Sequence, residues 1–365
     1  LVWMCFSLSA QKIIDLSGKW SFSIDRQDNG EKEKWFSHTL NDCINLPGSM
    51  PEKLKGDEVT AKTQWTGSLY DSSYYYNPYM EKYRKEGNIK FPFFLTPDKH
   101  YVGAAWYQKE VNIPADWKGE RILLFLERPH IETTVWVNGQ KTGMQNSLCV
   151  PHQYDITHYV RPGKCTITIR VDNRIKEINV GPDSHSITDQ TQGNWNGIVG
   201  RICLQTTPKT YFDDIQIYPE PEQKLARVKV VIKGTGTAKV KLSAESFNTD
   251  KKHIVPAIQQ EIKLNKGVTE TEMVLPMGND MLLWDEFHPA LYKLKAEVTN
   301  GKKTEIKEIQ FGMRRFEIKG KWFYVNGRKT QLRGTVENCD FPLTGYAPMD
   351  VESWERVFRI CRSYG

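Results

Sequence analysis

The sequence predicts a mostly β protein: a jelly-roll β-sandwich, an immunoglobulin-like β-sandwich and then a strand–loop–helix unit. Short alternating strands separated by Gly and Pro turns fill residues 102–207, as is typical of a jelly roll. Seven strand candidates follow within about a hundred residues. One amphipathic helix is predicted at the end of the sequence. A length of 365 residues favours two to three domains.

Composition excludes several classes of protein. The hydrophobic content of 39% supports real cores and excludes global disorder. The net charge of +6 is spread over 50 basic and 44 acidic residues, without the dense basic stripe of a nucleic-acid binder. Eleven Trp and sixteen Tyr either stack on sugar rings or fill sandwich cores, and composition leaves both open.

Residues 1–11, "LVWMCFSLSAQ", resemble the end of a secretory signal with a cleavage site near Ala10. This segment predicts export to the periplasm or the extracellular space. No stretch approaches the ~20 apolar residues of a membrane span. The seven Cys show neither paired nor metal-ligand spacing, so isolated thiols are expected.

The first sandwich is predicted over residues 12–207. "LSGKWSFSID" and "AAWYQKEVNIP" alternate like strands, and "TTVWVNGQKTG" is typical of a hairpin with Asn138-Gly139 at its turn. "KCTITIRVDN" places Ile167, Ile169 and Val171 on one face. Residues 50–100 are irregular and rich in Tyr, which favours either a loop at a sugar site or a packed surface loop.

The second sandwich is predicted over residues 208–312, where seven strand candidates have immunoglobulin-like spacing without the Cys…Trp…Cys signature. Residues 313–365 begin with another Asn-Gly hairpin, Asn326-Gly327, followed by a predicted strand over 331–336. Asp350 is the expected N-cap of the helix "VESWERVFRICRSYG".

Six motifs in this order resemble glycoside hydrolase family 2, the family of β-galactosidases, β-glucuronidases and β-mannosidases. They are "AAWYQKEVNIP", the block from "TTVWVNG" to "ITIRVDN", "NWNGIVGRICLQ", "LLWDEFHPALYKL", "FGMRRFEI" and "FYVNGRKTQLRGTVENCDFPLTG". Each match alone is weak, but six in order over most of the chain are specific. The resemblance implies a sugar-binding jelly roll, an immunoglobulin-like domain and a catalytic barrel.

A barrel of eight βα units needs ~250 residues, and residues 313–365 have room for one such unit. We therefore expect the sequence to be a fragment of a longer protein or the product of a truncated gene. We also expect the single βα unit to pack loosely on the immunoglobulin-like sandwich or to be mobile, because its barrel neighbours are missing.

The resemblance implies retaining hydrolysis by two glutamates that lie beyond Gly365, so no catalytic residue is assigned within this sequence. Retaining enzymes hold the two carboxyl groups about 5–5.5 Å apart. Neither Asp213-Asp214 nor Asp285-Glu286 fits, because adjacent residues of a strand point to opposite faces. We expect residues 1–365 alone to be inactive.

Because the catalytic residues are expected outside this sequence, the resemblance implies that this chain contributes residues that position the substrate. Arg333 and Gly334 match the family's Arg-Gly at the end of barrel strand one, and the family's following Asn-x-His is replaced here, so that the His is absent. A loop of the sugar-binding domain is the other expected contact, although the family's Asp is Thr191 here. The candidate substrate-binding residues are Asp189, Thr191, Gln192, Asn194, Trp195, Arg333, Glu337, Asn338 and Asp340. For Trp195, packing under its own loop is an equally weighted alternative.

Three functions are compatible with the sequence. The first is the N-terminal part of an exported exo-β-glycosidase acting on oligo- or polysaccharides with a β-linked terminal sugar, completed in cis by the missing barrel. The second is a stand-alone carbohydrate-binding module, and the third is a structural interaction protein without sugar affinity. No metal spacing, phosphate loop or dinucleotide fingerprint is present, so no cofactor is expected. Oligomeric state and the sugar's identity are left open.

Overall fold

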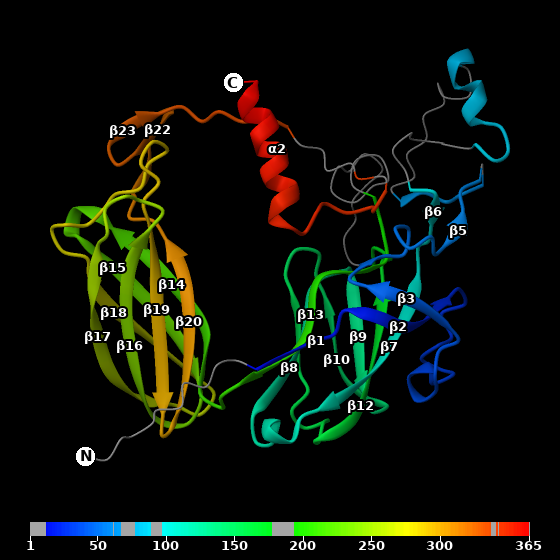
Figure 1. Cartoon of the computed structure of the whole chain (residues 1–365), viewed down its shortest axis with the longest axis horizontal. Helices are drawn as coiled ribbons and strands as arrows, with labels where there is room; N and C mark the ends of the chain where they lie inside the picture. The colour runs from blue at the N-terminus through cyan, green and yellow to red at the C-terminus, as the bar shows by residue number, and fades with distance from the viewer. Residues whose placement is uncertain are drawn as a thin grey trace. The chain divides into compact units, whose positions relative to one another are not determined.

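The computed structural model describes residues 12–60, 62–66, 77–88, 97–176, 193–336, 341 and 343–364 (Figure 1). The chain divides into two compact units. One consists of Ile13–Thr206 together with Val336–Gly365, and the other consists mainly of Thr207–Thr335. The predicted mostly β fold is confirmed in both units.

Two antiparallel sheets form the sandwich of the first unit. The five-stranded sheet has the order β1-β13-β8-β11, with β4 also paired to β13, and the six-stranded sheet has the order β10-β9-β12-β7-β2-β3. The strands of the first sheet are β1 (Ile13–Asp15), β4 (Gly48–Ser49), β8 (Arg121–His130), β11 (His152–Asp155) and β13 (Gly197–Thr207). Those of the second are β2 (Gly18–Asp25), β3 (Asp42–Leu46), β7 (Ala104–Ile113), β9 (Glu132–Val137), β10 (Gln140–Asn146) and β12 (Gly163–Asp172). A further short pair is β5 (Asp57–Glu58) with β6 (Lys99–His100).

Alternation along the strands sorts side chains between the core and the outer face of the six-stranded sheet. On β12, Ile167, Ile169 and Val171 are fully buried in the core, as predicted. The residues that alternate with them, Thr166, Thr168 and Arg170, therefore lie on the outer face. The predicted turn also forms: Asn138 and Gly139 have φ values of 50° and 77°, which a type I′ hairpin turn requires.

A patch of aromatic side chains covers part of this outer face. Trp106 and Trp136 stack with ring centroids 5.0 Å apart, and Phe36 stacks on Trp136 at 5.2 Å. Phe36 belongs to the short 3-10 helix η1 (Trp35–Ser37), which follows β2 in the chain. The loop between β2 and β3 thus crosses the outer face of the sheet.

The second unit contains the seven predicted strands in two sheets, β14-β15-β18 and β17-β16-β19-β20. Their buried faces enclose one hydrophobic core. The strands are β14 (Tyr211–Glu220), β15 (Leu225–Lys233), β16 (Gly236–Phe247), β17 (Ile254–Leu264), β18 (Val268–Pro276), β19 (Leu291–Asn300) and β20 (Lys303–Phe311). The second Asn-Gly turn joins β22 (Trp322–Val325) to β23 (Arg328–Thr330), and β21 (Phe316–Lys319) pairs with β22.

The predicted barrel strand over residues 331–336 is wrong, because these residues are exposed and form no strand. A strand needs a hydrogen-bonded neighbour, and the parallel barrel strand that would pair with this segment is not part of the sequence. The predicted helix is present as α2 (Val351–Ser363), and the Asp350 carboxylate accepts a hydrogen bond from the Ser353 N–H at 2.7 Å. Among the described residues, no helix is long and apolar enough to cross a membrane.

Candidate substrate-binding site

The structure places three of the predicted substrate-binding residues. Asp189, Thr191, Gln192, Glu337, Asn338 and Asp340 lie outside the described residues. Arg333 is exposed, on the strandless segment of the second unit. Asn194 and Trp195 lie immediately before β13 and are 5% and 3% exposed. The geometry of the site can therefore be followed from Asn194 and Trp195.

Three buried asparagines connect the end of β12 with the start of β13. The Asn194 side chain donates to the Asn173 carbonyl at 3.0 Å, and the Asn173 side chain accepts from the Gly103 N–H at 2.8 Å. The Asn196 side chain donates to the Gly103 and Val171 carbonyls at 2.9 and 3.0 Å. Buried backbone groups need hydrogen-bond partners. At the end of β12 and the start of β13, the asparagine side chains supply them. They fix Asn173 and Asn194, which lie before and after the segment 177–192 in the sequence.

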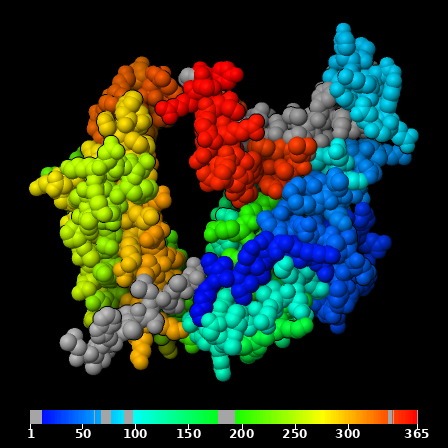
Figure 2. Space-filling model, viewed as in Figure 1, coloured from blue at the N-terminus to red at the C-terminus, as the bar shows by residue number. Residues whose placement is uncertain are grey.

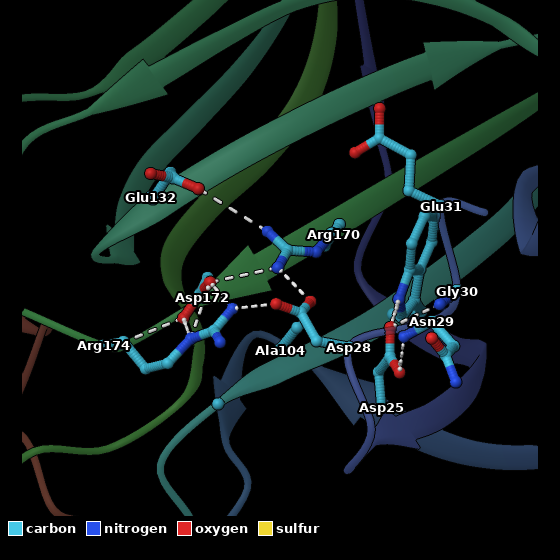
Figure 3. Close-up of polar contacts among 12 residues, drawn as sticks. Asp25, Asp28, Asn29, Gly30, Glu31, Ala104, Glu132, Arg170, Asp172 and Arg174 are labelled. Atoms are coloured by element: carbon cyan, nitrogen blue, oxygen red, sulfur yellow. Dashed lines mark hydrogen bonds and ion pairs between the residues drawn. The ribbon is translucent and has the colours of Figure 1, made fainter. Parts of the chain in front are cut away.

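A network of charges supports the same end of β12 (Figure 3). The Asp172 carboxylate is fully buried and pairs with Arg170, Arg174 and Lys176 at 3.1, 2.5 and 2.9 Å. Asp28, in the loop after β2, bridges Arg170 and Arg174 at 2.6 Å each. Burial alone would raise the pKa of Asp172, but the hydrogen bonds from Arg174 and Lys176 outweigh it and hold the pKa well below its usual range.

Trp195 lies in a stack of three rings. Its indole stacks on the His130 imidazole with centroids 4.6 Å apart and contacts the Tyr346 ring at 5.4 Å. The Asn194 side-chain oxygen lies 3.1 Å from His130 Nε2. Burial, together with the charge of Arg128, lowers the pKa of His130 to about 3, so its imidazole is neutral at pH 7.

Residues 343–350 lie against the jelly-roll sandwich (Figure 2). The Tyr346 hydroxyl donates to the Glu52 carboxylate at 2.9 Å, and the Ser49 hydroxyl donates to the Thr344 carbonyl. Gly345 has a positive φ of 81°, and a Cβ there would lie 3.2 Å from the Cβ of Trp195. Of the two expectations for this βα segment, packing on the immunoglobulin-like sandwich is not what the contacts of residues 343–350 show, and mobility stays a prediction for the segment. Its contacts are with the jelly roll, because Tyr346 finds both an aromatic and a carboxylate partner there.

A cavity of about 510 Å³ lies beside this contact, lined among others by Glu127, Arg201, Tyr346 and Asp350. Its charged side chains are already engaged. Glu127 and Arg201 pair at 3.2 Å, and Asp350 caps α2. The cavity therefore provides a concave surface, but its charged side chains are already paired with other groups of the protein.

The acidic residues considered as catalytic candidates have other partners in the structure. The two adjacent acidic pairs of the second unit are held by structural contacts: Asp213 pairs with Lys233 at 2.9 Å, and Glu286 pairs with Arg328 at 2.7 Å. Asp285 accepts hydrogen bonds from the Phe287 and His288 N–H groups, both at 2.8 Å. In the described ranges, no group of three or more His, Cys, Asp or Glu side chains could hold a metal ion.

Sequence reasoning missed His130, Glu52 and Tyr346. Nothing in the local pattern distinguishes them, since each acquires its role from a residue far away in the chain. Asp172 and Asn173 end the block "ITIRVDN", for which the sequence predicts no polar role. A buried strand that ends in an acid and an amide was the available signal, because polar residues at such a position must find partners.

Comparisons with known proteins agree on the family. The sequence model for the "Glycosyl hydrolases family 2, sugar binding domain" matches residues 13–208. The model for "Glycosyl hydrolases family 2" matches residues 210–314. A β-glucuronidase of Paenibacillus borealis is 23% identical over 355 residues, covering 92% of this chain and 51% of the relative. A β-galactosidase of Thermoanaerobacter pseudethanolicus is 25% identical over 281 residues, covering 72% of this chain and 35% of the relative. The chain thus spans about half, or less, of the length of these relatives.

Solved structures show the same fold. The Ruminococcus gnavus β-glucuronidase superimposes with a TM-score of 0.61 at 19% identity, over 89% of this chain and 47% of that one. An uncultured Clostridium sp. β-glucuronidase superimposes with a TM-score of 0.60 at 21% identity, over 88% of this chain and 48% of that one. Since the sugar-binding-domain model alone matches more than half of the sequence, the chain belongs to glycoside hydrolase family 2, as its motifs predicted.

Proposed function

We propose that the chain is the N-terminal part of a retaining exo-β-glycosidase that removes terminal β-linked sugars from oligo- or polysaccharides. The two consecutive family matches over residues 13–208 and 210–314 carry this proposal. The activities named for the relatives, β-glucuronidase and β-galactosidase, support a β-glycoside as substrate. Which sugar is released is left to the experiment below.

In this proposal the chain positions the substrate, and catalytic carboxyl groups outside residues 1–365 carry out hydrolysis. The acidic residues nearest to a catalytic pattern are committed to Lys, Arg or backbone partners. Retaining hydrolysis needs two carboxyl groups about 5–5.5 Å apart, one that attacks and one that protonates the leaving oxygen. We assign substrate contacts to Arg333, Glu337 and Asn338, with Asp340 and the segment that contains Asp189, Thr191 and Gln192 as further contacts.

Within the site, Asn194 and Trp195 act as positioning residues. Their side chains are bonded and stacked inside the protein, so they hold the base of the segment 177–192 and the residues 343–350 in fixed places. Enzymes lose rate when substrate-positioning groups move by about 1 Å. A direct sugar contact by either residue stays a prediction.

The domain boundaries 12–207, 208–312 and 313–365 belong to the same proposal, as sugar-binding, immunoglobulin-like and barrel-entry segments. Export rests on the apolar segment 1–11, which lies outside the described residues. Fractionation of cells that express the gene, with immunodetection of the chain, tests export.

The activity test compares residues 1–365 with the full product of the source reading frame. Nitrophenyl β-galactoside, β-glucuronide and β-mannoside are offered to both. We expect turnover by the longer product and none by residues 1–365. Turnover by residues 1–365 would place catalytic groups within this chain and overturn the assignment. A reading frame that ends at Gly365, together with sugar binding, would favour the stand-alone carbohydrate-binding module.

A further inference from the structure

A second cavity lies on the outer face of the six-stranded sheet. Its volume is about 310 Å³, at the lower end of small-molecule sites. One wall is the loop after η1, and the others are β7, β12 and the β9–β10 turn. The lining residues are Phe36, Ser37, His38, Thr39, Gln108, Asn138, Gly139 and Thr166.

The lining has the chemistry of a carbohydrate site. It combines one aromatic ring with hydroxyl, amide and imidazole groups, and it contains no Lys, Arg, Asp or Glu. Sugar hydroxyls both donate and accept hydrogen bonds, as do Ser, Thr, Asn and Gln side chains. Binding sites of this kind use an apolar surface for affinity and a few polar groups for orientation. The absence of charge in the lining favours a neutral sugar over a uronate.

One polar group of the wall is built into the sheet. Gln108 is only 8% exposed, and its side-chain nitrogen donates to the His38 carbonyl at 3.2 Å and to Thr168 Oγ1 at 3.1 Å. The contact with His38 fixes the loop against β7. Asn138 is fixed as well, since its side chain accepts from the Thr166 N–H at 2.9 Å and donates to the Tyr159 carbonyl at 3.1 Å.

The loop that forms the other wall is held in place before any ligand binds (Figure 3). The Asp25 carboxylate accepts from the Asn29 and Gly30 N–H groups at 2.9 and 2.8 Å, and from the Trp106 indole at 2.9 Å. Lys141 pairs with Glu31 at 2.8 Å. A preformed wall lowers the entropic cost of binding, because the loop does not have to be ordered by the ligand.

This cavity is separate from the substrate-positioning site. Thr166 lies six residues before Asp172 on β12, which is roughly 20 Å at ~3.3 Å per residue. The asparagine cluster and the Trp195 stack are at the Asp172 end of the strand. A ligand in the cavity therefore does not reach the residues assigned to substrate positioning.

We propose that this cavity is a second carbohydrate site, which takes one neutral pyranose unit of a glycan. It would hold the protein on a polysaccharide while the hydrolytic site acts on another part of the same polysaccharide. The binding itself does not depend on the proposed hydrolysis, so failure of one leaves the other standing.

Calorimetric titration of residues 1–365 tests the site. The neutral probes are methyl β-glycosides of galactose, glucose and mannose, with lactose, cellobiose and xylobiose, and methyl β-glucuronide is the charged probe, each at up to about 10 mM. Ser37→Trp places an indole at the mouth of the cavity, because Ser37 Oγ lies 3.8 Å from where a Cβ on Gly139 would be. Thr166→Val removes one hydroxyl while preserving its shape. Thr235→Trp and Thr237→Val are the matched controls, at exposed positions of the second unit.

We expect at least one neutral probe to bind, with affinity lowered about tenfold or more by Ser37→Trp and about threefold by Thr166→Val. The controls should change affinity less than twofold, and all four variants should keep the melting temperature of the parent chain. Three results would overturn the proposal: no binding by any neutral probe, binding that survives Ser37→Trp, or tighter binding of methyl β-glucuronide than of its neutral counterpart methyl β-glucoside.

Discussion

The rings of Trp195 and Tyr346 are in direct contact, with centroids 5.4 Å apart and planes inclined by 50°. This contact joins the jelly roll to the segment that leads into α2. Truncation of Tyr346 to Ala removes the ring and its hydrogen bond to Glu52, and we expect a loss of about 2–4 kcal/mol in the free energy of unfolding of the first unit. Tyr346→Phe keeps the ring and should cost only about 1 kcal/mol.

Hydrogen exchange of residues 343–350 distinguishes local from global effects. In Tyr346→Ala these amides should lose more protection than those of β7 and β12, whose loss is limited to the fall in the free energy of unfolding of the whole unit. Unchanged protection at residues 343–350 in Tyr346→Ala would show that the ring contact does not hold the segment.

His130 makes the stability of the first unit depend on pH. Its folded-state pKa is depressed to about 3, against an ordinary value of 6.5, by burial and by the Arg128 charge. Below pH ~6.5 the unfolded chain therefore binds a proton that the folded chain rejects. The free energy of unfolding should fall by up to about 1.4 kcal/mol per pH unit, or about 2 kcal/mol between pH 6.5 and 5.

Urea denaturation at pH 7.5, 6 and 5 measures this slope. Part of it also comes from His152, whose pKa burial lowers as well. The substitution His130→Gln should flatten the slope, whereas His158→Gln, at an exposed position, should leave it as it is. Equal slopes in the parent chain and His130→Gln would contradict the assignment.

Asp172 is the centre of a buried ion network, and its neutralisation takes from Arg170 the fully buried one of its three carboxylate partners, leaving Asp28 and Glu132. We expect Asp172→Asn to cost about 3–5 kcal/mol. Glu110→Gln is the matched control, because Glu110 pairs with Lys164 at 3.0 Å on the surface, where such pairs contribute about 0–1 kcal/mol. Thermal unfolding of the parent chain, Asp172→Asn and Glu110→Gln measures the loss of stability. A loss in Asp172→Asn as small as that in Glu110→Gln would mean that water compensates for the lost charge.

Gly30 is a position where a single methyl group should disturb the outer face of the sheet. A Cβ at Gly30 would lie 2.5 Å from Trp106 Nε1 and 2.7 Å from an Asp25 oxygen. Gly30→Ala should therefore displace the loop and cost about 1–3 kcal/mol. At Gly143 the nearest atom is 3.6 Å away, so Gly143→Ala should be tolerated. Equal melting temperatures for both variants would show that the loop can move aside cheaply.

Local patterns in the sequence predicted most of the fold. The Asn138-Gly139 and Asn326-Gly327 turns, the alternation on β12 and the Asp350 cap all depend on interactions within a few residues, and all four are confirmed. The strand over 331–336 failed for a different reason. Its residues have the correct local pattern, but a strand also needs neighbours, and pattern alone does not supply them.

The candidate site was less predictable because its contacts join distant parts of the chain. Nothing near Trp195 indicates that Tyr346 will cover it, and nothing near Asp28 indicates that Arg170 and Arg174 will pair with it. The sequence predicted that Asn194 and Trp195 lie just before a strand, and in the structure they precede β13. Their burial could not be inferred without the partners.

The attachment of residues 343–350 to the jelly roll also sets an order of events during synthesis. The ribosome releases Trp195 with its β-sandwich, but Tyr346 follows only about 150 residues later. At ~5–20 residues per second, the indole waits roughly 8–30 s for its covering ring, while the whole immunoglobulin-like sandwich is made in between. During this interval the face of Trp195 that Tyr346 later covers stays uncovered on the nascent jelly roll.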